Sequence, residues 1–532
     1  LAGPQAFNRI SAGGTLVGLD LPPAGKNLEL KPYAISRVTT DRTRTPAIRN
    51  DLGGDLGGDI KYGLTPNLTA DFTARTDFAQ VEIDEQQVNL TRFSLFFPEK
   101  RDFFLEGRGI FDFARGGAGA QSGTTTTDTP YLFYSRRIGL NRGRIIPINE
   151  GGRLTGKVGA WGIGAMNIQT GAEDVSATPS TNFTVLRVKR DVLRRSAIGA
   201  MVTNRSRAVN GVGGNLAYGL DGAFSFFQNL STGAYWARTQ TDGLEGDDTS
   251  YQGRLDYSAD RYGARAEFLA VDKNFNPEVG FLRRTDFKRS FGYLRFSPRP
   301  KRIKKVRKFT YDASSEYFVN GGGAVETRIH NAHFGTEFEN SDQISAEVTR
   351  DYELLVQPFR PSGSPVSIPR GGYTFSDLQA SYGFGAQRPI SGTVGIQVGH
   401  YYNGTIRSFT VGTGGLTPGR VALRKQLSLE PTLTVTKIEL PNGGFTTKLA
   451  RTRIDYGFTP LMFASALLQY NSADRAFSSN LRFRWEYRPG SELFLVYTDE
   501  RDTTDFAHVT PTTIRGLKNR AFVVKVNRLV RF

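Results

Sequence analysis

Apolar and polar residues alternate in short runs along most of this chain. The clearest run spans residues 480–488, where Leu481, Phe483 and Trp485 alternate with polar residues that include three arginines. Because successive side chains of a strand point to opposite faces, such a run predicts a strand with one apolar and one charged face. Similar runs occur at 251–258, 309–314 and 394–399. They recur from about residue 153 to the end of the sequence without a domain-like break, which predicts an all-β fold.

The number of these runs predicts a large transmembrane antiparallel β-barrel. We count about 24 strands, with a range of about 22–26, and bacterial single-chain barrels have even strand numbers. A soluble sandwich would bury its apolar faces as a core, whereas a membrane barrel turns them to lipid and lines its interior with the polar faces. Tyr and Trp near strand ends, where an aromatic girdle lies, favour the barrel. We expect a lead-in at 1–27 and one barrel domain at 28–532.

The C-terminal residues have the pattern of a closing strand. Apolar residues at spacing two end on an aromatic residue, which resembles the signal by which outer-membrane barrels are recognised for insertion. The set is Phe522, Val524, Val526, Val530 and Phe532, and Arg528 interrupts it. At the other end of the sequence, the first strand is expected at Leu28–Val38.

Two local patterns near the start predict other structures. Residues 53–59 read GGDLGGD, and we interpret them as a glycine-rich turn because calcium-binding repeats of this composition need several copies. Glu82–Arg92 has a moderate helical pattern and predicts a short helix, which Pro98 would end.

The stretch Asp77–Phe113 breaks the alternation. Its apolar residues come in clumps separated by charges, and it contains eight acids and four bases in a chain whose net charge is +17. A barrel of this width has a lumen several side chains across and usually holds a plug. We therefore predict that residues 78–150 form an acidic insert folded into a basic barrel.

Acids of the insert are expected to pair with bases of the insert and with arginines that point inward from the wall, because pairing offsets the cost of desolvating a charge. The candidate residues of the insert are Asp77, Glu82, Asp84, Glu99, Arg101, Asp102, Glu106, Arg108, Arg136 and Arg137, and those of the wall are Arg451, Arg453, Arg482 and Arg484.

Three separated blocks resemble a known bacterial family. They are the run from Asp77 through NLTRFSLFFPEKRDFFLEG, the block FYSRRIG at Phe133–Gly139, and the block NPEVGFLRRTDF at Asn276–Phe287. The sequence is similar here to the domain of unknown function family numbered 5916, whose members are thought to be outer-membrane β-barrels. The resemblance implies the barrel part of such a protein without the carbohydrate-binding-like domain that precedes it in many members.

The composition excludes several kinds of chemistry. The chain has no Cys, so disulfides, thiolate metal sites and cysteine nucleophiles are excluded. We find no nucleophile elbow, phosphate-binding loop or dinucleotide fingerprint, and we expect no catalytic residue, metal or cofactor. Glu99 and Glu106 are candidates for a glycosidase-like carboxylate pair. Bases lie within a few residues of both, which favours salt bridges instead. No nucleic-acid-binding motif accompanies the positive charge, so we expect no nucleic acid partner.

Three functions fit these patterns. The first is a monomeric barrel of the bacterial outer membrane, in contact with its lipid and lipopolysaccharide, whose plug closes or gates a channel for passage or export of solutes. The second is a cell-surface protein that binds or processes glycans, which the family's carbohydrate-binding-like domain implies. The third is a sealed barrel that anchors other surface proteins in a complex.

Overall fold

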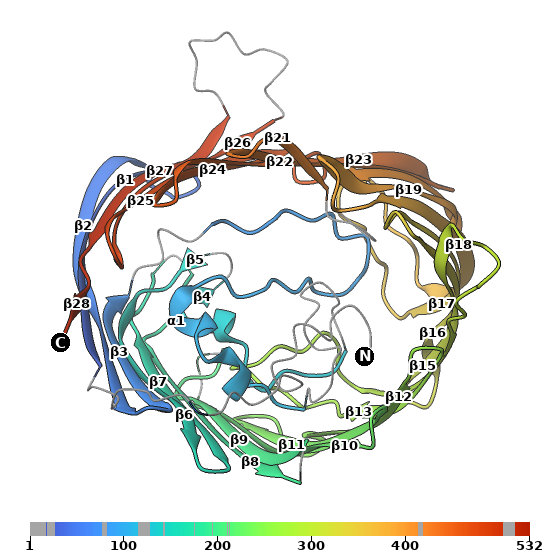
Figure 1. Cartoon of the computed structure of the whole chain (residues 1–532), viewed down its shortest axis with the longest axis horizontal. Helices are drawn as coiled ribbons and strands as arrows, with labels where there is room; N and C mark the ends of the chain where they lie inside the picture. The colour runs from blue at the N-terminus through green and yellow to red at the C-terminus, as the bar shows by residue number, and fades with distance from the viewer. Residues whose placement is uncertain are drawn as a thin grey trace.

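The computed structural model describes residues 18, 27–76, 82–114, 128–141, 144–174, 176–193, 195–209, 211, 213–412, 419–503 and 516–532. In this part of the chain one antiparallel sheet closes on itself as a barrel (Figure 1). Its wall has 24 strands, because β21 and β28 are short additions to a sheet of 26 hydrogen-bonded segments. The predicted all-β barrel of about 24 strands is therefore confirmed.

Each strand pairs with its neighbours in sequence, as expected when short connections join antiparallel strands. The strands of the wall are β1 (Leu28–Asp41), β2 (Ile48–Thr65), β3 (Leu68–Thr76), β6 (Ile148–Val158), β7 (Trp161–Thr170), β8 (Thr181–Val192), β9 (Ser196–Arg205), β10 (Asn215–Phe226), β11 (Leu230–Thr241), β12 (Thr249–Ser258), β13 (Tyr262–Val271), β14 (Phe287–Phe296), β15 (Val306–Asn320), β16 (Val325–Phe338), β17 (Gln343–Leu355), β18 (Gly371–Phe384), β19 (Ile390–Tyr401), β20 (Gly404–Gly412), β22 (Leu427–Leu440), β23 (Gly443–Thr459), β24 (Met462–Asn471), β25 (Ala476–Arg488), β26 (Ser491–Asp502) and β27 (Leu517–Asn527). The short additions are β21 (Arg420–Arg424) and β28 (Val530–Arg531).

The barrel closes between its first and last long strands. β1 pairs with β27 over nine residue pairs, from Tyr33 opposite Asn527 to Asp41 opposite Asn519, and with β28 beyond them. Phe522 and Val526 are exposed on the outer face, whereas Val523 and Lys525 between them are buried. The C-terminal alternation thus gives the closing strand an apolar outer face.

The charged faces of the strands point inward. On β25, Leu481 and Trp485 are 43% and 42% exposed, whereas Arg482 and Arg484 between them bond to partners inside the barrel. Exposed Leu, Val, Ile, Phe, Tyr and Trp side chains recur on strands around the wall. An apolar outer face and a polar interior are the arrangement of a membrane barrel. No helix of the described residues is long and apolar enough to cross a membrane.

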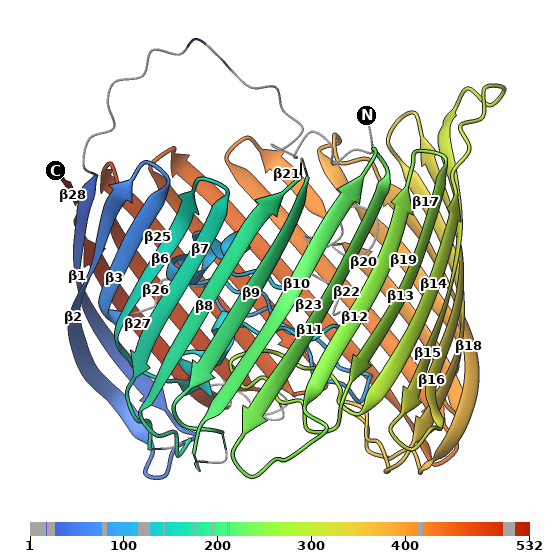
Figure 2. The same ribbon diagram turned by 90° about the horizontal axis from the view of Figure 1, so that it is seen from below.

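The two ends of the barrel differ in the length of their connections (Figure 2). At the end where β1 begins and β27 ends, β2 and β3, β6 and β7, and β23 and β24 are each joined by two residues. We call this the short-turn end. The opposite end carries the longer connections, including those between β3 and β6, β13 and β14, and β17 and β18.

The prediction of a turn at residues 53–59 is wrong, because these residues lie inside β2. Their glycines make room for a neighbouring side chain. A Cβ at Gly57 would lie 2.4 Å from the hydroxyl oxygen of Tyr33. The ring of Tyr33 crosses β2, so that its hydroxyl donates to the carbonyl of Arg75 on β3 at 2.8 Å. Glycine in a strand interior marks this kind of close approach.

The prediction of a helix at Glu82–Arg92 is also wrong, because residues 82–90 are extended and irregular. Hydrogen bonds to the wall, described below, satisfy their polar groups in place of helical ones. The short helices lie further on, at α1 (Asp102–Leu105), η3 (Arg108–Ile110) and η4 (Ser135–Arg137), followed by the small hairpin of β4 (Leu140–Asn141) and β5 (Arg144–Ile145).

Candidate functional site

The connection between β3 and β6 folds into the barrel. Its described residues, 82–114, 128–141 and 144–147, lie within the ring of strands in Figure 1, and we call them the internal segment. Its first part, residues 82–93, is the strap, and residues 103–113 and 131–138 are the packed part. The two parts are held to the wall by different kinds of contact.

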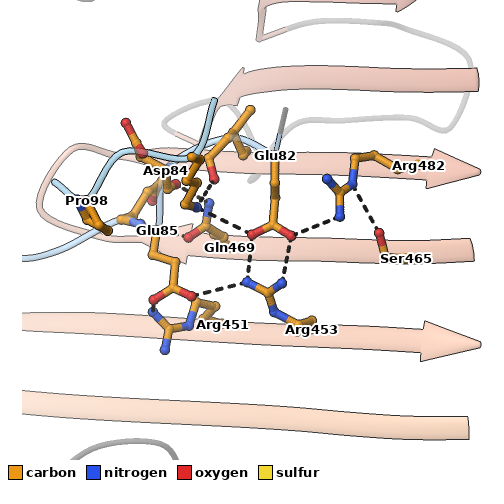
Figure 3. Close-up of polar contacts among 12 residues, drawn as sticks. Glu82, Asp84, Glu85, Pro98, Arg451, Arg453, Ser465, Gln469 and Arg482 are labelled. Carbon is orange, nitrogen blue, oxygen red and sulfur yellow. Dashed lines mark hydrogen bonds and ion pairs between the residues drawn. The ribbon is translucent and has the colours of Figure 1, made fainter. Parts of the chain in front are cut away.

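An ion pair with an arginine of β23 holds the start of the strap (Figure 3). Arg453 donates from Nη1 and Nη2 to the two carboxylate oxygens of Glu82, at 2.7 and 2.6 Å. Arg482 of β25 lies 3.6 Å from the same carboxylate, and Lys100 approaches it from the internal segment at 3.5 Å. The Glu82 side chain is only 8% exposed, so three bases surround a nearly buried acid.

Residues 84–86 extend these contacts across β23, β24 and β25. Glu85 pairs with Arg451 and also accepts from Arg453 at 3.3 Å. The side-chain amide of Gln469 bonds twice to the strap, accepting from the backbone N–H of Gln86 at 2.8 Å and donating to the carbonyl of Asp84 at 3.1 Å. The strap therefore lies against this part of the wall through polar contacts.

The far end of the strap is held by other strands. Tyr401 of β19 donates to the carbonyl of Leu90 at 2.6 Å, and the backbone N–H of Ser362 donates to the carbonyl of Asn89 at 3.1 Å. Arg92 then pairs with Glu353 of β17 at 2.5 Å and with Glu326 of β16. Here the charges are reversed, with a base on the strap and acids on the wall.

An apolar core holds the packed part. Its buried residues on the internal segment meet buried side chains on β6 to β15 and in the connection between β13 and β14. The members on the internal segment are Phe104, Phe111, Phe113, Leu132 and Ile138, and those on the wall include Met166, Ile168, Phe183, Met201 and Tyr235. Burial of this kind stabilises by roughly 1.5–3 kcal/mol for each large side chain. The packed part is therefore the firmly anchored part of the internal segment.

Glu99 and Arg101 form an ion pair inside the internal segment. Both side chains are about 5% exposed, and Arg101 donates from Nε and Nη2 to the two oxygens of Glu99 at 2.8 and 2.7 Å. Ser135 donates to the same carboxylate, and Arg101 also donates to the carbonyls of Ser135 and Ile138. Burial alone would raise the pKa of Glu99, but the hydrogen bonds and charge of Arg101 outweigh it and hold that pKa below its ordinary value.

Glu106 joins the internal segment to β2 and β6. It pairs with Lys61, and Arg153 lies 3.4 Å from it while donating at 2.6 Å to Asp71 of β3. Burial raises the pKa of Glu106, yet Lys61 and Arg153 together lower it below the ordinary value. A general acid of a glycosidase needs a raised pKa, so both candidate carboxylates are shifted in the opposite direction.

The three sequence blocks that resemble the known family contact one another beside the packed part. Tyr131 and Phe281 exchange backbone hydrogen bonds at 2.9 and 3.0 Å, and the N–H of Tyr134 donates to the carbonyl of Val279 at 2.9 Å. The ring of Phe96 lies 4.9–5.3 Å from the rings of Tyr131, Tyr134 and Phe281. The blocks are therefore one packing unit between the internal segment and the connection from β13 to β14.

A known family matches the part of the chain that contains the first two of these blocks. Residues 24–149 match the model of a family described as Domain of unknown function (DUF5916). The match confirms the resemblance seen in the sequence. It covers β1 to β3, the internal segment and the start of β6, and the block at Asn276–Phe287 lies outside it. No curated protein matches the chain.

Solved structures with a similar course of the chain are distant in sequence. A mutant of the ferric enterobactin receptor PfeA from Pseudomonas aeruginosa is 9% identical, with a TM-score of 0.41 over 96% of this chain and 81% of that one. OccAB3 from Acinetobacter baumannii is 8% identical, with a TM-score of 0.31 over 95% and 99%. OpdQ from P. aeruginosa is 8% identical, with a TM-score of 0.28 over 95% and 98%. Likenesses this low carry no argument about what this chain binds.

The remaining sequence candidates lie elsewhere. Arg136 pairs with Asp84 inside the internal segment, and Arg137 donates to the carbonyl of Gly280 at 3.0 Å. Arg484 pairs with Glu492 of the neighbouring strand and not with the internal segment. Asp102 and Arg108 are exposed, and within the described ranges neither forms an ion pair. Asp77 lies outside the described residues.

Sequence reasoning missed several partners of the internal segment. They are Arg92 on the strap and, on the wall, Arg153, Glu326, Glu353, Tyr401 and Gln469. The alternation of the wall strands marks such residues as facing inward, but it does not say what they meet. Among the described residues, no group of three or more His or acidic side chains could hold a metal ion.

Proposed function

We propose that this barrel spans a bacterial outer membrane and is a gated channel for solutes, in which the internal segment is the plug and the strap is its moving part. The observation that carries the proposal is the contrast between the two parts. The packed part is buried in an apolar core against β6 to β15, whereas residues 82–86 contact β23 to β25 through ion pairs and hydrogen bonds.

This contrast determines where an opening would form. Polar contacts are exchanged for contacts with water at little net cost, whereas separating an apolar core costs about 25 cal/mol for each Å² exposed. Residues 82–86 of the strap can therefore leave β23 to β25 while the packed part stays in place. Leu90 at the far end of the strap stays with the apolar cluster that contains Leu355 and Tyr401. An opening would then lie between the internal segment and β23 to β25.

The side chains that line this opening indicate the class of solute. Release of the strap leaves Arg451, Arg453 and Arg482 of the wall without the carboxylates of Glu82 and Glu85. Arg484 lies on the same inward face of β25. A pore lined by arginines prefers anions, so we propose that the open channel passes anionic solutes.

Single-channel conductance in a planar bilayer tests this proposal. We compare the intact protein with Glu82→Gln/Glu85→Gln, which releases the strap but keeps the packed part. The expected result is small or no steps for the intact protein and larger or more frequent steps for the variant. Under a salt gradient, the reversal potential of the variant is expected to show anion preference.

The matched control is Glu267→Gln/Glu316→Gln. It also removes two inward acids, but these pair with Arg289 within the wall on β13 to β15. The control is expected to conduct as the intact protein does. Equal increases in both variants would show a general effect of lumen charge, and folded protein with no steps in any form would contradict the channel.

The second candidate is a sealed barrel that anchors other surface proteins. The observation that favours it is that the strap is held at both ends, by Glu82 on β23 and by Arg92 on β16 and β17. It predicts no conductance in any variant and co-purification of other chains with the barrel.

A further inference from the structure

Among the connections that the structure describes at the short-turn end, the one between β14 and β15, Ser297–Lys305, contains the most basic residues. It reads SPRPKRIKK, and the five residues 301–305 are all exposed. We call Ser297–Lys305 the basic loop. The other connections described at this end are mostly of two to five residues.

Most of the charge of the basic loop is not neutralised by the protein. Arg299 pairs with Asp260 at 2.9 Å, and Arg307, just beyond the loop, pairs with Glu337 at 2.6 Å. The remaining cations form no ion pair with any residue that the structure describes; they are Lys301, Arg302, Lys304 and Lys305. Four exposed cations so close together repel one another unless an anion binds among them.

A row of aromatic rings lies on the outer face of the strands beside the loop. The ring centroids of Tyr262 and Phe296 are 5.5 Å apart, those of Phe296 and Tyr311 are 6.4 Å apart, and those of Tyr311 and Phe334 are 5.2 Å apart. Tyr262 and Tyr311 are 52% and 45% exposed. Exposed aromatic residues near strand ends mark the level of the lipid headgroups on a membrane barrel.

A further cation connects the row with the polar end. The guanidinium of Arg261, in the turn between β12 and β13, lies 5.6 Å from the ring centroid of Tyr262 and 5.3 Å from that of Phe296. An exposed arginine stacked on rings at the membrane boundary keeps its charge at the level of the phosphates.

We propose that the basic loop, together with Arg261, binds the phosphate headgroups of anionic glycerophospholipids in the membrane leaflet at the short-turn end. Cations without acidic partners attract anionic headgroups, and the adjacent aromatic row places them at headgroup level. An acidic protein partner would use the charge but would leave the exposed aromatic row unexplained. Bacterial outer-membrane barrels have short periplasmic turns, so the proposed leaflet is the periplasmic one.

Lipid retention measured by native mass spectrometry tests the proposal. The full chain, in a nonionic detergent, is titrated with phosphatidylglycerol and with phosphatidylcholine of the same acyl chains. Each cation near an anionic surface contributes measurably to binding, so Lys301→Gln/Arg302→Gln/Lys304→Gln/Lys305→Gln is expected to weaken phosphatidylglycerol retention by at least about tenfold. Phosphatidylcholine retention is expected to stay unchanged.

The matched control is Arg195→Gln/Arg424→Gln/Lys425→Gln/Arg488→Gln, which removes four exposed cations from other turns of the same end. It is expected to retain phosphatidylglycerol as the unmodified chain does. Unchanged retention in the loop variant, or an equal loss in both variants, would overturn a specific headgroup site.

Cysteine labelling tests which leaflet the loop faces, because the chain has no Cys of its own. Arg302→Cys in the basic loop is expected to resist a membrane-impermeant maleimide in intact Gram-negative cells and to react after the outer membrane is opened. Gly322→Cys, in the exposed turn between β15 and β16 at the opposite end, is the control and is expected to react in intact cells. Labelling of Arg302→Cys in intact cells would place the loop against lipopolysaccharide and overturn the proposed leaflet.

Discussion

Arg453 of β23 donates both terminal guanidinium nitrogens to the carboxylate of Glu82, across 371 residues of sequence. This bidentate pair is the centre of the contacts between strap and wall, because Arg482 and Lys100 approach the same carboxylate. Bidentate arginine–carboxylate pairs fix orientation as well as charge. The pair therefore positions the start of the strap against β23 to β25.

Removing the Glu82 charge is expected to loosen the strap without unfolding the barrel. Glu82→Gln removes the acid that Arg453 and Arg482 share, and although Glu85 still accepts from Arg453, the loss costs about 1.5–3 kcal/mol of strap docking. Hydrogen–deuterium exchange of residues 83–90 is expected to speed up by roughly 10–150-fold, while exchange in β23 stays unchanged. Glu267→Gln, whose partner Arg289 lies on the wall, is expected to leave the strap as it is. Unchanged exchange at 83–90 in Glu82→Gln would show that the ion pairs do not hold the strap.

A covalent link between strap and wall is expected to keep the channel closed. The backbones of Asn89 and Ser362 are joined by a hydrogen bond of 3.1 Å, so we expect cysteines at these two positions to be close enough to form a disulfide. In a chain that carries Glu82→Gln/Glu85→Gln, we expect oxidised Asn89→Cys/Ser362→Cys to suppress the added conductance and reduction to restore it. The single variant Asn89→Cys controls for the substitution. Persistent conductance after the disulfide has formed would contradict a gate that needs the far end of the strap to move.

The Glu99–Arg101 pair predicts how the stability of the internal segment depends on pH. The pKa of Glu99 is lower in the folded chain than its ordinary value of 4.5. The pair therefore stabilises the fold fully above pH about 4.5, and the contribution is lost as the pH falls through the lowered pKa. Glu99→Gln is expected to be less stable than the unmodified chain at pH 7, with a difference that shrinks toward pH 3. Thermal unfolding at a series of pH values measures it. A difference that stays constant over this range would contradict the assignment.

Gly57 is expected to be intolerant of any side chain. A Cβ there would lie 2.4–2.6 Å from the hydroxyl oxygen and two ring carbons of Tyr33, whose hydroxyl is itself hydrogen-bonded to β3. We expect Gly57→Ala to destabilise the barrel by about 1–3 kcal/mol, measured by unfolding in denaturant. Gly253→Ala is the control, because a Cβ at Gly253 meets no atom within 4 Å, and it is expected to change stability by less than about 0.5 kcal/mol. Equal stability of the two variants would show that Tyr33 moves aside freely.

The barrel could be predicted from the sequence, whereas the course of the strap could not. The wall strands pair with sequence neighbours and show one apolar face outward, so a period of two in the sequence is enough to predict them, as at Leu481 to Trp485. The helix predicted at Glu82–Arg92 failed because the polar groups of the strap bond to Gln469, Ser362 and Tyr401, which are distant in sequence. A local sequence pattern contains no information about partners that are distant in the sequence.

For the glycines and the charges, too, the sequence predicted the general feature and only the structure shows its place. The sequence GGDLGGD has the composition of a turn, and only the tertiary structure shows that it lies in a strand, where the ring of Tyr33 occupies the space that a side chain at Gly57 would need. Likewise, the excess of acids at Asp77–Phe113 predicted pairing with basic residues but not which pairs form. Glu82 meets Arg453 of the wall, whereas Glu99 meets Arg101 two residues away.

The sequence by itself determined that this protein is a barrel of about 24 strands with an acidic stretch of different character. Alternation and charge balance are local properties, and the closed sheet follows from them strand by strand. Only the tertiary structure decided which part of the internal segment is buried in an apolar core and which is held by ion pairs to β23 to β25. The physical reason is that both kinds of contact join residues of the internal segment and of the wall that are far apart in the sequence, and their meeting depends on the curvature and register of the whole wall.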